Sequence, residues 1–194
     1  MSRHQEDPSH AVKPFQPNSD GHVHGEGAAA LVLESHASVK KRNANTIAKL
    51  TGWSRGFGNF RSPNFADTIV SVAEAALNMA GLSAQDLSHI NACGLATPWA
   101  DNVEALAISR LSPHSEILAL KSVLGHAGPS SAVIETVASL LAMTHHSYPL
   151  SLMTNVSYRD GLRPATEYPN DRSAFLKLAF SPEGQIAALV FDAA

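Results

Sequence analysis

The segment at residues 129–144 has the spacing of a helix, yet apolar side chains fall on every side of it. They are Ala132, Val133, Ile134, Val137, Ala138, Leu140, Leu141 and Met143. A helix at a protein surface keeps one polar face, so this one is predicted to be buried all round. It carries Glu135, and its apolar part, residues 132–143, is too short to span a bilayer. The segment therefore predicts a helix held between layers of a larger fold.

Strand-like and helix-like segments alternate along the rest of the chain. Apolar runs predict strands at residues 28–34, 46–53, 89–92, 117–120, 174–180 and 186–191, the last two joined by a turn at residues 181–184. Helical spacing predicts helices at residues 67–80 and 103–111 and a short capped turn at residues 83–86. This alternation indicates an α/β fold with a mixed β-sheet flanked by helices.

The first twenty residues differ in character from the rest of the chain. Pro8, Pro14 and Pro17 stand among polar residues without any periodicity, which suits an extended polar arm at the surface. We expect residues 1–20 to form this arm and residues 21–194 to form a single domain.

Charge is scarce in this chain. Asp, Glu, Lys and Arg make up 16% of its 194 residues, against a usual share of about a quarter, and the formal net charge is −3. The acidic balance argues against binding to nucleic acid or to a membrane through a polybasic patch. So few charges also suggest that part of the surface is covered by another chain. The polar start of the chain does not resemble a secretory signal, which predicts a cytoplasmic location.

Cysteine and histidine usage gives no metal site. Cys93 is the one cysteine, which excludes an internal disulfide and a multi-cysteine centre. The pairs His22 with His24 and His145 with His146 lack a third ligand at a recognisable spacing. The glycine-rich residues 21–27 lead into a predicted strand, whereas phosphate-binding loops lead out of one into a helix.

Two segments carry polar or reactive side chains between a short strand and a helix. One runs from Asn91 through Cys93 and Thr97 to Asp101 and Glu104, and the other runs over residues 121–126 and on to residue 135. Proteins of the α/β class place their functional sites in such loops, at the carboxyl edge of the sheet.

The same residues resemble the C-terminal half of a β-ketoacyl-(acyl-carrier-protein) synthase of the thiolase superfamily. The resemblance rests on Gly25-Glu26-Gly27-Ala28, Leu31-Val32-Leu33-Glu34, Asn91-Ala92, Gly94, Thr97-Pro98, Asp101, Glu104, Lys121-Ser122, Gly125-His126 and Glu135. It covers nearly the whole chain. It implies the C-terminal half of a thiolase-like fold, in which a complete molecule places the helix at residues 129–144 between two sheets.

The resemblance also implies a reaction and roles for single residues. Such enzymes join acyl and malonyl thioesters by decarboxylative Claisen condensation in fatty-acid or polyketide synthesis, using a nucleophilic cysteine, two histidines and a lysine. His126 matches the second histidine and Lys121 the lysine. Glu135 matches an acidic residue of the following helix, and Thr97 matches a threonine that contacts the phosphopantetheine arm. Asp101 and Glu104 are expected to be structural residues near the site.

Three departures from the family pattern matter for chemistry. Cys93 replaces the first histidine, and a thiol is a weak hydrogen-bond donor. Leu95 stands in place of a second pantetheine-contacting threonine, and residues 181–184 replace a gating loop rich in glycine and phenylalanine. The family's nucleophilic cysteine lies in an N-terminal half, and Cys93 cannot take its place because it matches a histidine.

Two functions stay open on these grounds. The parent protein is either a condensing enzyme, to which this half supplies Lys121 and His126, or a non-catalytic ketosynthase-like partner of the chain-length-factor type. A degradative thiolase is a weaker alternative, because it needs a further cysteine after residue 93.

We expect no metal or resident cofactor, substrates carried on the phosphopantetheine of acyl carrier protein or on CoA, and dimer formation. Met1–Arg3 match the middle of a family surface segment, so we expect a fragment of a longer chain that does not condense by itself and that binds the N-terminal ketosynthase half.

Overall fold

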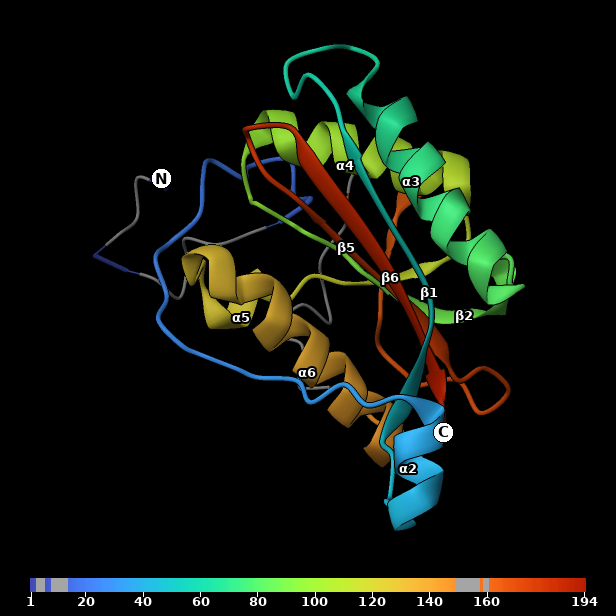
Figure 1. Ribbon diagram of the computed structural model, residues 1–194. Helices are drawn as coiled ribbons and strands as arrows, with labels where there is room; N and C mark the ends of the chain where they lie inside the picture. The colour runs from blue at the N-terminus through green and yellow to red at the C-terminus, as the bar shows by residue number, and fades with distance from the viewer. Residues whose placement is uncertain (3–5, 8–13, 149–157, 159–160) are drawn as a thin grey trace.

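The computed structural model describes residues 1–2, 6–7, 14–148, 158 and 161–194. Its helices and strands alternate along the chain as predicted for an α/β protein (Figure 1). The elements are α2 (His36–Arg42), β1 (Ala48–Phe57), α3 (Phe65–Ala80), η1 (Ala84–Asp86), β2 (Leu87–Asn91), α4 (Pro98–Leu111), β3 (Glu116–Leu118), α5 (Lys121–Leu124), η2 (Gly128–Ser130), α6 (Ser131–His145), β4 (Arg163–Pro164), β5 (Ala174–Phe180) and β6 (Gln185–Ala193).

The strands form one mixed sheet of six, in the order β1-β6-β5-β2-β3-β4. β1, β6 and β5 pair in antiparallel fashion, and β5, β2, β3 and β4 pair in parallel. The predicted C-terminal hairpin is present, and its turn places Gly184 at φ +96°. A Cβ at Gly184 would lie 2.0 Å from the carbonyl oxygen of Gly58, so a larger residue does not fit there.

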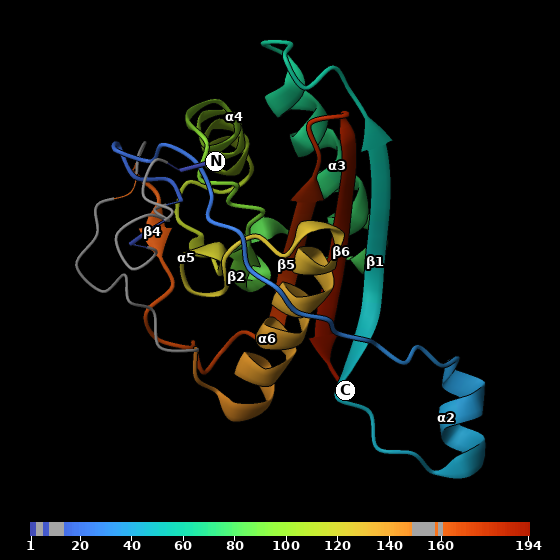
Figure 2. The same cartoon turned by 90° about the vertical axis from the view of Figure 1, so that its left-hand side faces the viewer.

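Helices cover both faces of the sheet. α3 and α6 lie on opposite faces (Figure 2), and each face has its own apolar core. α3 packs closely on β1, because Cβ atoms at Gly52 and Gly56 would lie 2.0 Å from Ala76 O and 2.5 Å from Val72 Cγ2. On the other face, Leu140 and Met143 of α6 pack in a cluster with Phe175 and Phe191 of the sheet.

The prediction that the helix at residues 129–144 is buried all round is wrong for this chain. α6 buries Glu135, Thr136 and Ser139 together with Leu140 and Met143, while Leu141 is 52% exposed. The buried face therefore carries polar side chains, and part of the apolar surface faces outward. The reason is that the described chain supplies one sheet, which covers one side of the helix.

The predicted buried strand at residues 28–34 is also wrong. This stretch forms no strand in the structure, and Val32 and Leu33 are 87% and 69% exposed. The preceding residues lie against α6, since Ser130 Oγ donates to the carbonyl oxygen of Gly27 at 2.9 Å. The chain then runs on to α2, which buries no residue and projects from the body (Figure 2). Apolar content alone predicted a strand, but this stretch pairs with none of the described strands of the sheet.

Other boundaries differ by a few residues. The strand predicted at residues 46–53 runs to Phe57, and the helix predicted from residue 103 begins at Pro98, with Thr97 as its N-cap. Proline at the first helical position suits a helix start because its missing N–H needs no partner there. Within the predicted arm, Pro8 lies outside the described residues, whereas Phe15 is fully buried in the core. The division between residues 1–20 and 21–194 stays a prediction.

Candidate functional site

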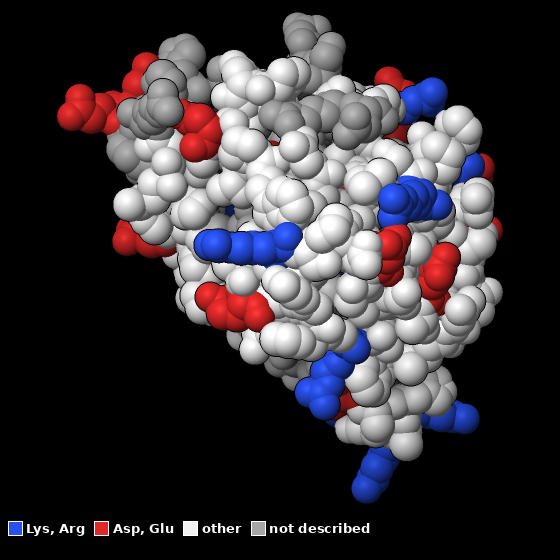
Figure 3. All heavy atoms as spheres, turned by 90° about the horizontal axis from the view of Figure 1, so that it is seen from above, with Lys and Arg blue, Asp and Glu red and all other residues white. Residues whose placement is uncertain are grey.

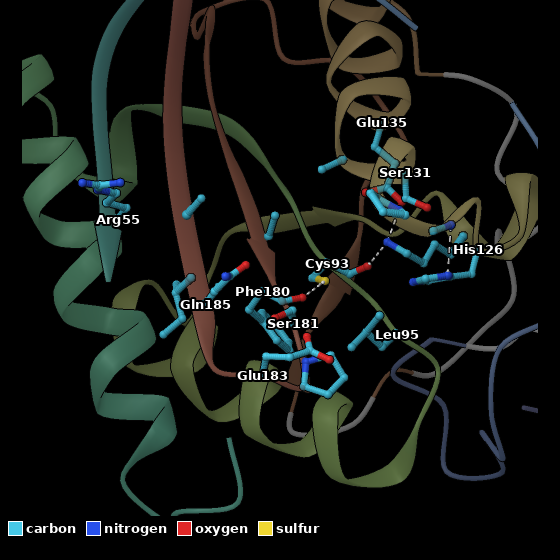
Figure 4. Close-up of a pocket in the computed structure, with 18 of the residues that line it drawn as sticks. Arg55, Cys93, Leu95, His126, Ser131, Glu135, Phe180, Ser181, Glu183 and Gln185 are labelled. Carbon is cyan, nitrogen blue, oxygen red and sulfur yellow. Dashed lines mark hydrogen bonds and ion pairs between the residues drawn. The ribbon is translucent and has the colours of Figure 1, made fainter. Parts of the chain in front are cut away.

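The two segments singled out from the sequence meet beyond the carboxyl ends of β2 and β3. β2 and β3 are parallel neighbours, with Asn91 opposite Leu118, so the loops that follow them emerge side by side. They open on a pocket of about 960 Å³ between the sheet and α6 (Figure 4). Cys93, Lys121, His126 and Glu135 all line it. Four of the predicted site residues are thus brought together.

Lys121 is held in place by two hydrogen bonds. Its Nζ donates to the carbonyl oxygen of Cys93 at 2.6 Å and to Glu135 Oε1 at 2.6 Å, and the residue is 2% exposed. Burial acts to lower the pKa of Lys121, but the neighbouring Cys93 and Glu135 outweigh it and the pKa lies above its ordinary value. Lys121 is therefore a charged ammonium group at the floor of the pocket.

A second lysine, Lys177, shares the same carboxylate. It rises from the middle of β5, and its Nζ donates to Glu135 Oε2 at 2.5 Å, to Asn91 Oδ1 at 2.8 Å and to the carbonyl oxygen of Ala92 at 3.2 Å. Burial acts to raise the pKa of Glu135, but Lys177 and Lys121 outweigh it and hold that pKa below its usual value. Sequence reasoning missed Lys177. The available signal is a lysine in the middle of the otherwise apolar run at residues 174–180.

His126 is positioned by backbone contacts with the glycine-rich segment. Its N–H donates to the carbonyl oxygen of Val23 at 2.8 Å, and its carbonyl oxygen accepts from the N–H of Gly25 at 3.1 Å. A Cβ at Gly25 would lie 2.2 Å from the carbonyl oxygen of Leu124, so glycine is required for this approach. Gly25 thus serves the site by allowing the two backbones to approach each other closely.

The hydrogen bonding of His126 fixes which ring nitrogen carries the proton. Nδ1 accepts from the backbone N–H of Gly128 at 3.2 Å, so in the neutral ring Nε2 bears the hydrogen. Burial, followed by the charge of Lys121, lowers the pKa of His126 below its ordinary value. The neutral ring therefore dominates at pH 7 and offers an N–H donor at the pocket wall.

Cys93 faces the pocket as a neutral thiol. Its Sγ donates to the carbonyl oxygen of Phe180 at 3.6 Å, and burial raises the pKa of the thiol to about 11. A thiolate is the nucleophilic form of cysteine. Cys93 is thus neither an activated nucleophile nor a strong donor.

Asp101 and Glu104 support the loop from behind and do not line the pocket. Glu104 accepts from the backbone N–H groups of Cys93 and Gly94 at 2.6 and 2.8 Å, and burial raises its pKa to about 7. Asp101 accepts from the N–H of Phe15 at 2.7 Å. Both carboxylates are fully buried. Thr97, placed in the site by the sequence, lies at the start of α4 and is not among the pocket-lining residues.

Among the described residues, no three His, Cys, Asp or Glu side chains lie where they could share a metal ion. No helix in the described ranges is long and apolar enough to cross a bilayer.

A family model decides the identity. Residues 47–155 match the model for the C-terminal domain of β-ketoacyl synthases. The chain belongs to this family.

Curated relatives agree with this ketosynthase assignment. The chain is 33% identical over 144 residues to a polyketide biosynthesis malonyl-ACP decarboxylase, PksF, of Bacillus subtilis, an alignment that covers 73% of this chain and 34% of the relative. It is 32% identical over 158 residues to 3-oxoacyl-[acyl-carrier-protein] synthase 2 of Mycobacterium leprae, covering 78% of this chain and 37% of the relative. The ketosynthase domain thus spans little more than a third of the length of these relatives.

Solved structures show the same thiolase-like fold. The ishigamide ketosynthase/chain length factor superposes with a TM-score of 0.83 at 26% identity, covering 94% of this chain and 47% of that one. A type II polyketide ketosynthase in complex with its acyl-carrier protein, AntDE:AntF, superposes with a TM-score of 0.82 at 25% identity, covering 97% and 49%. The predicted α/β fold, a mixed sheet flanked by helices, is confirmed.

Proposed function

We propose that this ketosynthase domain supplies the Lys121–His126 side of a site that binds an acyl thioester in fatty-acid or polyketide synthesis. The observation that carries the proposal is the Nε2–H of His126, which the Gly128 contact leaves as the donor on a pocket wall. A donor placed at a thioester carbonyl stabilises negative charge as it develops on oxygen. The substrate is carried on phosphopantetheine of acyl carrier protein or on CoA, and no metal or resident cofactor takes part.

In a decarboxylative condensation, the malonyl thioester loses CO₂ and leaves a thioester enolate. The enolate carbon attacks the carbonyl of an acyl group held as a thioester on a nucleophile, the new C–C bond forms, and the thiolate of that nucleophile leaves. His126 would hold the enolate oxygen, and the charge of Lys121 would favour the same anion. The nucleophile that accepts the acyl group must come from outside this chain, because the thiol of Cys93 has a pKa of about 11.

The test uses a malonyl-pantetheine analogue in which an amide replaces the thioester. Addition of the analogue to the ¹⁵N-labelled chain is expected to shift the His126 imidazole signal, and His126→Ala is expected to weaken binding about ten-fold through loss of one hydrogen bond. His145→Ala is the matched control, because His145 is an exposed histidine at the end of α6. No binding by the wild-type chain, or equal binding by His126→Ala, would contradict the proposal.

A second candidate function is that of a non-catalytic partner subunit in a complex of the chain-length-factor type. Cys93 and the buried Leu95 favour it, because both line the pocket and neither offers a strong donor to a substrate. In either case we propose that the N-terminal half of a ketosynthase and an acyl carrier protein are partners, within a dimer in the cytoplasm.

Release of CO₂ from malonyl carrier protein separates the two functions. The chain by itself is expected not to condense substrates, because it lacks a nucleophile. Together with a polypeptide that provides the N-terminal half, a catalytic site is expected to lose about a hundred-fold in rate on His126→Ala. A partner-only role predicts that wild type and His126→Ala give the same rate.

A further inference from the structure

The pair of lysines on one buried glutamate is the feature of this site that the proposed function does not yet use. Lys177 and Lys121 come from different elements, β5 and α5, and both are 2% exposed. A lysine is almost never this deeply buried without a partner. Both reach Glu135, which is 1% exposed.

The two ammonium groups divide the carboxylate between them. Lys121 binds Oε1 at 2.6 Å, and Lys177 binds Oε2 at 2.5 Å. Two positive charges therefore face one negative charge. A carboxylate can accept a pair of parallel bonds from a single cation, but here Lys177 occupies the second oxygen, and Lys121 is held to the first.

Because Lys177 binds the second oxygen of Glu135, Lys121 makes a single hydrogen bond to that carboxylate. An ammonium group has three N–H bonds. One is given to Glu135 and one to the carbonyl oxygen of Cys93, and the side chain lines the pocket. Within the described residues, the third N–H has no protein acceptor, which makes it available to a ligand oxygen.

Lys177 also supports the loop that Lys121 contacts. It donates to Asn91 Oδ1 at 2.8 Å and to the carbonyl oxygen of Ala92 at 3.2 Å, directly before Cys93. Asn91 in turn donates to the carbonyl oxygen of Glu135 and to Ser139 Oγ, both at 2.7 Å. One ammonium group thus joins β5, the end of β2 and α6 beneath the pocket.

We propose that Lys177 is a positioning residue. It occupies one oxygen of Glu135 and so leaves Lys121 with an N–H that can donate to the substrate. This donor matters because Cys93, the neighbouring pocket residue, offers only a thiol, which is a weak donor. Lys121 and His126 then form a pair of donors for one thioester oxygen. This inference rests on the proposed function, because it assumes that the pocket holds a thioester.

The first measurement is independent of any ligand. In ¹⁵N spectra of the Lys side chains, the buried Lys121 ammonium group is expected to give a protected signal. Lys177→Met keeps the length and apolar stem of the side chain but frees Glu135 Oε2, so the Lys121 signal is expected to move. In Lys177→Arg, which retains the positive charge, the Lys121 signal is expected to stay at its wild-type position. Lys49→Met is the matched control, since Lys49 is an exposed lysine of β1.

The second measurement is the affinity for the malonyl-pantetheine amide analogue. Lys177→Met is expected to bind it about ten-fold more weakly, the effect of one charge-assisted hydrogen bond, and Lys177→Arg within about two-fold of wild type. If Lys177→Met does not fold, Lys177→Gln retains a hydrogen-bond donor without the charge and is tested in its place.

The outcomes separate this inference from the proposed function. An unchanged Lys121 signal in folded Lys177→Met or Lys177→Gln overturns the positioning role, whatever the chain binds. A moved signal with unchanged affinity overturns the role of Lys121 as a substrate donor. Absence of binding by the wild-type chain overturns the proposed function and this donor role, while the signal still decides whether Lys177 positions Lys121.

Discussion

At the scale of single residues, the chemistry of the pocket depends on which groups are charged. Lys121 is held as an ammonium group beside Glu135, whereas Cys93 and the ring of His126 are neutral at pH 7. Each state follows from the competition between burial and nearby opposite charge. The ionised groups have short hydrogen bonds to charged partners, and the neutral ones do not.

Cys93 is expected to be unreactive in the folded chain. Burial raises the pKa of its thiol to about 11 from an ordinary value of 9.0. At pH 7.5 this lowers the thiolate fraction about a hundred-fold relative to an unfolded chain. Modification by iodoacetamide, followed by mass spectrometry, is expected to slow by at least that factor. The same chain in concentrated urea is the control, and an equal rate in both conditions would contradict the assignment.

Glu104 is expected to make stability depend on pH. Burial raises its pKa from 4.5 to about 7 in the folded chain. A folded pKa above the unfolded one stabilises the protein fully below pH 4.5, and this contribution is lost as the pH rises through about 7. Replacement by glutamine removes the titration but keeps one acceptor oxygen.

The measurement for Glu104 is urea unfolding of wild type and Glu104→Gln between pH 4 and pH 8. The free energy of unfolding of wild type is expected to fall relative to the variant by on the order of 3 kcal/mol across this range. A difference between the two proteins that does not change with pH would show that Glu104 titrates normally.

The sequence predicted some site residues and missed others for a physical reason. Cys93, Lys121 and His126 lie in the segments that follow the short strands β2 and β3, where local patterns mark a site. Lys177 acts on Glu135 from 42 positions away in the chain. Such a long-range contact depends on the order of strands in the sheet, which local periodicity does not contain.

At the scale of elements, α6 buries polar and apolar side chains together on the side that faces the sheet. Glu135 and Ser139 face the sheet, where Lys177, Asn91 and His89 bind them. Apolar spacing identified the helix correctly but could not say which side is covered. That depends on the layers that surround the helix, and the described chain contains one sheet.

Two adjacent leucines of α6 test this view of the helix. Leu140 is 8% exposed and packs in the core, while Leu141 is 52% exposed. Leu140→Ala is expected to lower the free energy of unfolding by about 2–4 kcal/mol through the cavity that it leaves. Leu141→Ala is expected to change it by less than about 0.5 kcal/mol.

Urea unfolding of both leucine variants at one pH provides the comparison. Equal losses in the two variants would mean that the outer face of α6 is already covered in solution, for example by a second molecule.

At the scale of the whole molecule, the low content of charged residues goes together with exposed apolar side chains. On the face that Figure 3 shows, charged side chains are scattered among mostly uncharged ones. Large apolar side chains are exposed at several places, namely Val32, Leu33, Trp53, Phe57 and Leu141. Trp53 and Phe57 alternate with Gly52 and Gly56, which face α3, so they lie on the face of the sheet that carries α6.

This exposed apolar surface is expected to make the chain associate with itself. Monomeric proteins rarely expose large apolar patches, and the ketosynthase relatives contain about twice the length of chain or more. Sedimentation velocity at increasing concentration is expected to show oligomers of the wild-type chain. Because Val32 and Leu33 lie in an extended stretch with no strand partner among the described residues, replacing both by aspartate is expected to weaken the association about ten-fold or more.

Met79→Asp is the matched control for self-association. Met79 is 55% exposed, but it lies on α3, on the opposite face of the sheet from α6. If the surface beside α6 drives association, Met79→Asp associates as wild type does, because it alters exposed apolar area elsewhere. Two results would show that the apolar surface beside α6 does not drive association. One is a wild-type chain that stays monomeric at every concentration, and the other is a Met79→Asp variant whose self-association is as weak as that of the double variant.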